Sequence, residues 1–221
     1  MRPPLPPFTD PAIVAGYAET TPRKVPGFAD LHRMATLLLA ERAPEVAEIL
    51  VVGAGGGLEL KAFAEAEPGW RFLGVDPSAE MLDLARRTLG PLQPRVDLRQ
   101  GTVDAAPSGP FDGATCLLTL HFLDKDERRA TLRAIHRRLR PGAALVVAHH
   151  SCPDGADLGR WLSRSLAFAG GSNIDQASAS MAERLPVLTV KDDEALLREA
   201  GFSDVALFYA GFSFRGWVAL A

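Results

Sequence analysis

The feature that most constrains the fold of this chain is a cluster of glycines directly after a short apolar run. Residues Ile49 to Val52 are all aliphatic, and Gly53-Ala54-Gly55-Gly56-Gly57 follows them. Glycine permits tight turns with positive φ and lets a ligand come close to the backbone. A helical pattern begins near Gly57. The segment therefore predicts a strand, a turn and a helix, in that order.

The same order of strand and helix recurs along the chain. A second apolar run, Phe72 to Val75, leads to Ser78, which is suited to cap a helix that Gly90 ends. Further strands are predicted at 95–100, 111–120 and 143–148. Two strand-like runs around Ala210 and Gly211 predict an antiparallel hairpin at the C-terminus. The fold class predicted is α/β, with a doubly wound, mostly parallel sheet of seven strands.

Length and composition suit one domain. The chain has 221 residues, of which 47% are hydrophobic and 23% charged, as in ordinary soluble globular proteins. Prolines dominate the start, so we predict a flexible lead over residues 1–25 and a single domain over 26–221. A serine-rich stretch at about 151–185 is predicted to be a helical insertion. We expect residues 1–30 and this insertion to form a lid over a ligand.

Charge and cysteine content exclude several classes of protein. The formal net charge is -3, so no global basic field attracts nucleic acid, and we expect no direct nucleic-acid binding. Cys116 and Cys152 cannot build a disulfide framework, and no apolar stretch reaches the roughly 18 residues of a membrane helix. We therefore expect a cytoplasmic enzyme with no membrane partner. The sequence leaves open whether the chain forms a homodimer.

An acidic residue after the second apolar run supports a ligand-binding site at the glycine loop. Asp76 stands 23 residues after Gly53, and ligands of doubly wound sheets bind beyond the carboxyl ends of the strands. A carboxylate there can accept hydrogen bonds from both ribose hydroxyls of a nucleoside. The alternative is that Asp76 caps the helix that follows. Leu58 stands where a dinucleotide-binding loop needs its third glycine, and no Gly-Lys-Ser or Gly-Lys-Thr follows for a phosphate loop.

Three segments resemble the motifs of class I S-adenosylmethionine-dependent methyltransferases. They are ILVVGAGGG, FLGVDPSAEML and FDGATCLLTLHFL, and with the strand after them they cover residues 49–148. The resemblance implies a Rossmann-like methyltransferase fold and S-adenosyl-L-methionine as cofactor. It also implies an enzyme that transfers a methyl group to a small-molecule acceptor.

The resemblance also implies which residues hold the cofactor. Gly53, Ala54 and Gly55 match the loop beside the methionine part of the cofactor, and Asp76 and Pro77 match the acid that binds the ribose and its neighbour. Thr102 and Val103 match the segment beside the adenine, and Phe28 matches an aromatic residue that covers the cofactor. Val51 stands where many of these enzymes have an acid, so the partner of the cofactor's amino group must lie elsewhere.

Nearly the whole chain is similar to a narrower group, the carboxy-S-adenosylmethionine synthases, which make the donor used in tRNA wobble-uridine modification. The similarity runs through VPGFADLHRM, the segment from Leu118 to Val147, and the tail from Leu196. Such a synthase is therefore the alternative function. Leu117 and Leu196 stand where the synthases have an asparagine and an arginine that face the ligand. Because leucine cannot pair with the extra carboxylate of that ligand, ordinary methyl transfer is favoured.

Three histidines are the candidate catalytic residues. His121, His149 and His150 are predicted just past the fourth and fifth strands, at the edge of the sheet where the ligand is expected. One of them could be the base that deprotonates a hydroxyl or amine acceptor. The alternative is a hydrogen-bonded or solvent-facing loop histidine. No metal site is predicted, because adjacent residues in a strand point to opposite faces.

Overall fold

The computed structural model describes residues 8–221, which alternate between helices and strands. In chain order the elements are α1 (Pro11–Lys24), α2 (Phe28–Ala40), β1 (Glu48–Val52), α3 (Leu58–Ala66), β2 (Arg71–Asp76), α4 (Ala79–Leu89), η2 (Gly90–Arg95), β3 (Val96–Gln100), η3 (Val103–Ala105), β4 (Phe111–Leu117), η4 (Leu120–Phe122), α5 (Lys125–His136), β5 (Leu139–Cys152), α6 (Leu158–Phe168), α7 (Ile174–Arg184), β6 (Leu188–Thr189), α8 (Val190–Glu199), β7 (Ser203–Gly211) and β8 (Phe214–Leu220).

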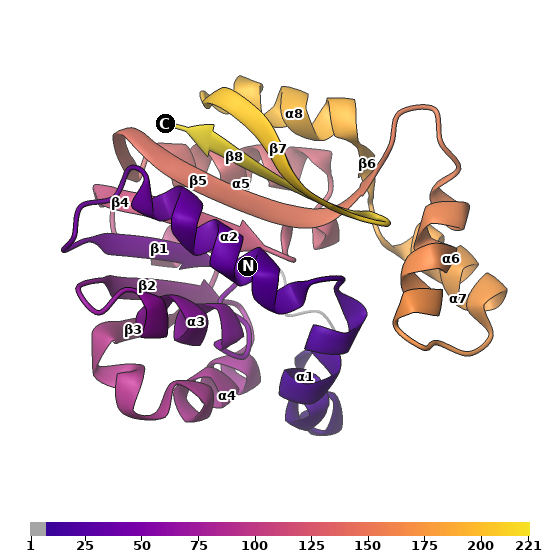
Figure 1. Ribbon diagram of the computed structural model, residues 1–221, viewed down its shortest axis with the longest axis horizontal. Coiled ribbons are helices and arrows are strands. Elements are labelled where there is room, and N and C mark those ends of the chain that lie inside the picture. The colour runs from indigo at the N-terminus through magenta and orange to yellow at the C-terminus, as the bar shows by residue number, and fades with distance from the viewer. Residues whose placement is uncertain (1–7) are drawn as a thin grey trace.

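The strands form one twisted sheet in the order β3-β2-β1-β4-β5-β8-β7, with the short β6 paired to β5 (Figure 1). Strands β1 to β5 are parallel to one another. Strand β8 is antiparallel to both β5 and β7, so the chain ends in an antiparallel hairpin. The predicted fold class, a doubly wound and mostly parallel sheet with this hairpin, is confirmed.

Helices cover both faces of the sheet and bury a separate apolar core on each. One core contains Leu31 and Leu39 of α2 and Phe63 of α3, packed on β1 and β2. The other contains Ile135 of α5 and Leu196 of α8, packed on β4, β5 and β8. Every residue of β4 is buried, as expected for a central strand of a sheet covered on both sides.

Two helices begin at capping residues that can be identified in the sequence. Ser78 caps α4 by accepting a hydrogen bond from the backbone N–H of Met81. Asp124 and Glu127 form a capping box at the start of α5. Both helices follow strands at the same edge of the sheet, so these caps fix where the chain turns back beyond the carboxyl ends of β2 and β4.

The structure has a helix within residues 1–25, which the sequence predicted to be a flexible lead. Residues Pro11–Lys24 form α1, Asp10 caps it by accepting from the N–H of Ala12, and Pro11 occupies the first turn. Proline is well suited to the first turn of a helix because its missing N–H has no intrahelical partner there. The first seven residues of that predicted lead lie outside the described part of the chain.

The predicted helical insertion at about 151–185 contains α6 and α7, which pack against each other to one side of the sheet (Figure 1). Strand β5 is longer than predicted, because it continues through Cys152 instead of ending at Ala148. His149 and His150 therefore belong to the strand, where they pair with Arg215 and Phe214 of β8.

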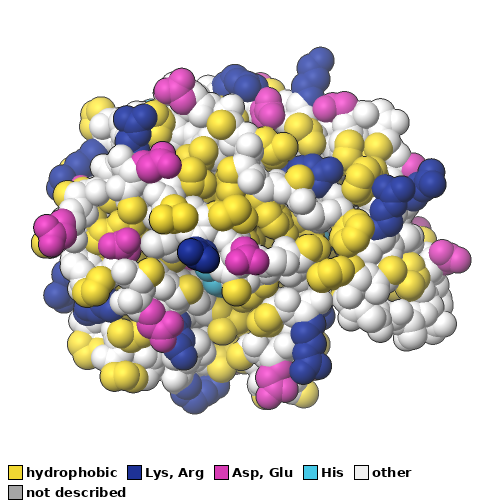
Figure 2. Space-filling model, viewed as in Figure 1, with side chains coloured by type: hydrophobic (Ala, Val, Ile, Leu, Met, Phe, Trp, Pro, Cys, Tyr) yellow, Lys and Arg dark blue, Asp and Glu magenta, His cyan; other side chains and the backbone are white. Residues whose placement is uncertain are grey.

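Figure 2 shows hydrophobic side chains gathered across the middle of one face, with acidic and basic side chains interspersed around them. Within residues 8–221, no helix has the length and apolar character that a membrane span requires.

Candidate active site

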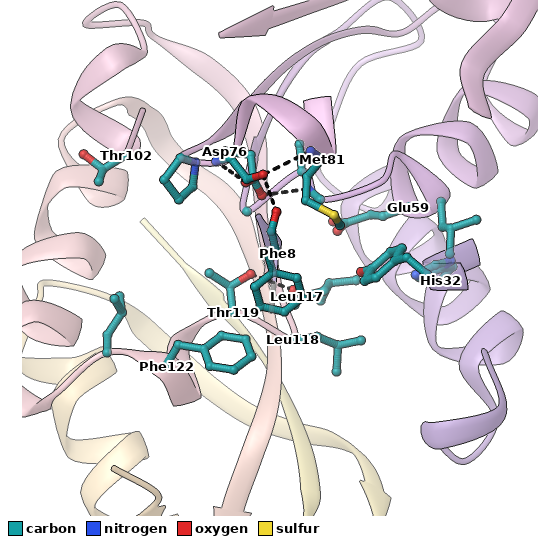
Figure 3. A pocket seen from close by; sticks show the side chains of 18 of the residues that line it. Phe8, His32, Glu59, Asp76, Met81, Thr102, Leu117, Leu118, Thr119 and Phe122 are labelled. Carbon is teal, nitrogen blue, oxygen red and sulfur yellow. Dashed lines mark hydrogen bonds between the residues drawn. The ribbon is translucent and has the colours of Figure 1, made fainter. Parts of the chain in front are cut away.

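A pocket opens beyond the carboxyl ends of β1, β2 and β4, where the sequence predicted a ligand. Its wall combines the glycine loop, acidic and apolar side chains, and parts of α1 and α2 (Figure 3). The lining residues are Phe8, Tyr17, Phe28, His32, Gly53, Ala54, Gly55, Leu58, Glu59, Asp76, Pro77, Ser78, Met81, Thr102, Leu117, Leu118, Thr119, Phe122 and Leu123. The pocket therefore lies between the sheet edge and the N-terminal helices.

Asp76 joins the glycine loop to the start of α4. Its Oδ2 accepts a 2.9 Å hydrogen bond from the N–H of Gly55, and its Oδ1 accepts one of 2.9 Å from the N–H of Ser78. Burial raises the pKa of this carboxyl group, and the two backbone donors oppose that rise. Each carboxylate oxygen can accept more than one hydrogen bond, so both can still receive a ligand hydroxyl.

Backbone conformation and close neighbours disfavour side chains at two positions of the glycine loop. A Cβ at Gly53 would lie 2.1 Å from the Thr119 hydroxyl oxygen, and Gly53 has a φ of 80°. Gly55 has a φ of 50°, and a Cβ there would lie 3.3 Å from the Tyr17 hydroxyl. Thr119 itself is held by a 2.9 Å hydrogen bond to the carbonyl of Leu117. Glycine is thus required here by both backbone conformation and space.

Glu59 is a buried carboxyl group in the wall of this pocket. It is the second residue of α3 and only 7% exposed, and its Oε1 accepts a hydrogen bond from the hydroxyl of Thr115 on β4. Burial raises its pKa to about 8, although the Thr115 bond acts in the opposite direction. The carboxyl group is therefore mostly protonated at neutral pH unless a cation lies beside it.

Two further titratable side chains line the pocket, and each is neutral near pH 7. Burial, with Asp76 and Glu59 nearby, raises the pKa of Tyr17 to about 12. Burial lowers the pKa of His32 to about 4, and its ring packs edge-on against Phe28 with centroids 4.4 Å apart. Neither group is a strong general base.

The structure brings most of the predicted cofactor residues together. Phe28, Gly53, Ala54, Gly55, Asp76, Pro77 and Thr102 all line the pocket. Val103 does not; it is buried in the core next to the pocket, at the start of η3.

Two other expectations are met only in part. Leu117 lines the pocket, but Leu196 is 1% exposed in the core between α8 and the sheet, so only Leu117 can face a ligand there. Phe8 and Tyr17 from the predicted lid line the pocket, whereas no residue of 151–185 does among those described.

None of the three predicted catalytic histidines lines the pocket. His121 lies just past β4, as predicted, but His149 and His150 lie within β5 and not past its end, which corrects their predicted position. His149 and His150 are inside β5 and, with His121 of η4, are buried. As alternation in a strand requires, the two neighbours diverge: His149 packs against Trp217, and His150 stacks on Phe214. Burial lowers the pKa of His150 to about 3 and that of His121 well below its usual range. None of the three is placed to act as a base on a ligand in the pocket.

Sequence reasoning missed Tyr17, Glu59 and His32. For Glu59 a signal existed: it shares the buried face of α3 with Leu60 and Phe63, so it is a charged residue within an apolar stripe. Tyr17 gave no such signal, because only the packing of α1 over the glycine loop brings it into the site.

Comparisons with known proteins agree with this geometry. Residues 49–142, which carry the glycine loop and Asp76, match the family model described as a methyltransferase domain. This stretch of the chain is therefore similar to a methyltransferase domain. S-adenosylmethionine is the cofactor of such domains, and a pocket that binds it must hold an adenosyl group and an amino-acid group.

Curated relatives match the chain beyond the methyltransferase domain. The carboxy-S-adenosyl-L-methionine synthase of Chromohalobacter salexigens is 27% identical over 220 residues, covering 95% of this chain and 82% of that protein. The synthase of the same name from Erwinia tasmaniensis is 26% identical over 224 residues, covering 96% of this chain and 90% of that protein.

Solved structures share the fold. The structure titled PigF with SAH superposes with a TM-score of 0.69 at 19% identity, covering 97% of this chain and 61% of that one. Human N-acetylserotonin methyltransferase in complex with SAM gives a TM-score of 0.64 at 16% identity, covering 96% of this chain and 57% of that one. The chain thus spans about three-fifths of each of these solved proteins.

The residues of the pocket fit S-adenosylmethionine. Gly55 offers a backbone surface that a side chain would fill, and Asp76 offers free acceptor capacity for ribose hydroxyls. Apolar side chains such as Phe28 and Met81 can cover the aromatic and aliphatic parts of such a ligand.

Proposed function

We propose that this chain transfers the methyl group of S-adenosylmethionine to a small-molecule acceptor. The main support for the proposal is the hydrogen bond from the Gly55 N–H to Asp76. Through it, a carboxylate and the backbone of the glycine loop lie side by side in one pocket. In this proposal Gly53, Ala54 and Gly55 hold the methionine side of the cofactor and Asp76 its ribose. Phe28, Pro77 and Thr102 enclose it, with Val103 beneath the adenine end.

S-adenosylmethionine supplies a methyl group already activated by a sulfonium centre. The chain's own residues therefore need mainly to align the acceptor and exclude water. Phe8, Leu118, Phe122 and Leu123 give the pocket an apolar wall suited to an acceptor with an aromatic or aliphatic body. Tyr17 keeps its proton and can donate a hydrogen bond, and neutral His32 can accept one.

A second candidate is the carboxy-S-adenosylmethionine synthase activity named for the curated relatives. Similarity along nearly the whole chain favours it. Against it, Leu117 is apolar, and no Lys or Arg lines the pocket in the part of the chain that the structure describes. An extra ligand carboxylate would have no cationic partner among those residues, and its burial would be costly.

One experiment distinguishes the two activities. The purified protein is incubated with methyl-labelled S-adenosylmethionine and a small-molecule extract, and mass spectrometry follows both the label and any ligand that copurifies. Transfer of label to a small molecule, lost in Asp76→Ala, is the expected result. A copurified S-adenosylmethionine heavier by a carboxyl group would instead establish the synthase, and label found only in RNA would overturn the small-molecule acceptor.

A further inference from the structure

Glu59 is a carboxyl group that faces the ligand site without a cation. Among the residues that the structure describes, its hydrogen-bond partner is the Thr115 hydroxyl, which donates to Oε1. The described lining of the pocket contains no Lys or Arg, and His32 is neutral near pH 7 because burial lowers its pKa. A carboxyl group that is 7% exposed in such surroundings would be stabilised by a positively charged ligand group.

The position of Glu59 along the pocket matches one end of the cofactor. In the view of Figure 3, Thr102 lies at one end of the pocket, Glu59 and His32 lie at the other, and Asp76 lies between them. An S-adenosylmethionine whose ribose is held by Asp76 and whose adenine lies near Thr102 would direct its amino-acid end toward Glu59. That end carries the ammonium group.

The sheet register explains how an acid reaches this place from a helix. Val51 of β1 and Thr115 of β4 are paired, and paired residues of adjacent parallel strands project from the same face. The Glu59 side chain extends from α3 to the Thr115 hydroxyl, so its carboxyl group lies over β4, on the face from which Val51 of β1 also projects. The uncharged Val51 left the partner of the cofactor's amino group unassigned in the sequence, and Glu59 brings a carboxyl group to the residue of β4 that is paired with Val51.

We propose that Glu59 binds the ammonium group of the amino-acid end of S-adenosylmethionine and makes the pocket selective for ligands that keep this group. The inference rests on the proposed function, because it assumes that Asp76 holds the ribose in this pocket. A ligand ammonium would supply the cation that Glu59 lacks and favour its ionised form. Binding near pH 7 then releases a proton from Glu59 to the buffer.

The direct test compares two ligands, S-adenosylhomocysteine and its deamino analogue, by isothermal titration. Wild-type protein is expected to bind S-adenosylhomocysteine tenfold or more tightly than the analogue, as one charge-assisted hydrogen bond implies at about 1.4 kcal/mol per tenfold. Glu59→Gln keeps the size of the side chain and should lose most of this preference by weakening only the amino ligand. Glu65→Gln, at an exposed position of α3, is the matched control.

A second measurement uses the wild type alone, so it does not depend on how the variant folds. Titrations at pH 7 in buffers of different ionisation enthalpy count the protons released on binding. Close to one is expected with S-adenosylhomocysteine and close to none with the deamino analogue, because a pKa of about 8 leaves Glu59 mostly protonated in the free protein. Tyr17 and His32 titrate far from pH 7. Asp76, whose pKa burial also raises, faces the ribose and would respond to both ligands alike.

The outcomes separate this inference from the function on which it rests. Equal affinity of the wild type for both ligands, or equal proton release, would overturn the role of Glu59 while leaving the cofactor site in place. Failure of the wild type to bind S-adenosylhomocysteine would overturn the cofactor site itself, and the role of Glu59 with it.

Discussion

Asp76 accepts a 2.9 Å hydrogen bond from the backbone N–H of Gly55, so the acid that ends β2 holds the loop that follows β1. The other oxygen of the same carboxyl group accepts from Ser78 at the start of α4. One side chain therefore fixes the relative positions of a glycine loop and a helix start on neighbouring strands. The sequence offered ligand binding and helix capping as alternatives for Asp76, and the geometry allows one carboxyl group to do both.

Replacing Asp76 by alanine is expected to weaken binding of S-adenosylhomocysteine by at least about tenfold, the loss of one charge-assisted hydrogen bond. Isothermal titration measures the change, and circular dichroism checks that the variant folds. Asp83→Ala is the control, because Asp83 lies on α4 with its side chain 63% exposed and pairs with nearby Arg86 at the surface. Unchanged affinity in a folded Asp76→Ala protein would contradict the ribose assignment.

The fold was predictable because its signals are local. Aliphatic runs followed by glycine, serine or aspartate caps mark each strand and the helix after it, and those marks correctly placed β1, β2, β4 and α4. Helix α1 was not predicted because prolines generally favour irregular chain, whereas Asp10 and Pro11 begin this helix. The end of β5 was also missed, since histidines in an aliphatic strand carry no clear strand signal.

Glu59→Gln is expected to change how the stability of the ligand-free protein depends on pH. Burial raises the pKa of Glu59 from 4.5 to about 8 in the folded protein. Because the pKa of Glu59 is higher in the folded than in the unfolded protein, its contribution to the free energy of unfolding is complete below pH 4.5. This contribution falls by up to about 1.4 kcal/mol per pH unit as the pH rises to about 8. Urea unfolding at a series of pH values should show this loss in the wild type and a flatter profile in the variant. Coincident profiles would show that Glu59 is ionised without a ligand.

Two adjacent aspartates of α8 form ion pairs with α5, one buried and one exposed. Asp193 is 2% exposed and pairs with the guanidinium of Arg128, and His149 lies 3.2 Å away. Asp192 pairs at 2.9 Å with Lys125 at the surface, where its side chain is 41% exposed. Removing one partner of a buried pair leaves an uncompensated charge, whereas an exposed pair contributes little.

Asp193→Ala is therefore expected to lower the free energy of unfolding by about 3–5 kcal/mol, and Asp192→Ala by about 1 kcal/mol or less. Urea unfolding at pH 7 measures both. Burial would raise the pKa of Asp193, but His149, Arg128 and Ser151 outweigh it and hold the pKa below 3.8. The contribution is thus present above that pH and lost only on acidification, so it is complete at pH 7. Similar losses in the two variants would show that Arg128 finds another partner.

The candidate site was harder to predict than the fold, because half of it comes from residues far apart in the chain. The glycine loop and Asp76 were recognisable since their spacing is set by one strand, one turn and one helix. Tyr17 and His32 reach the pocket only through the packing of α1 and α2 over the sheet edge. The histidines of β5 were predicted from residue type alone. Strand alternation turns His149 toward the core that contains Trp217 and His150 toward the core that contains Phe214.

Gly16→Ala tests whether α1 is a stable helix in solution. Gly16 lies inside α1, and an added Cβ would meet only the Thr20 methyl group, at 3.9 Å. Alanine in a helix interior is more stable than glycine by about 0.5–1 kcal/mol, so the free energy of unfolding should rise by that amount. Gly155→Ala is the opposite control: its site is open, but its φ of 69° disfavours alanine, so stability should fall by about 1 kcal/mol. Urea unfolding compares the two. No gain from Gly16→Ala would mean that residues 11–24 are the flexible lead that their prolines suggested.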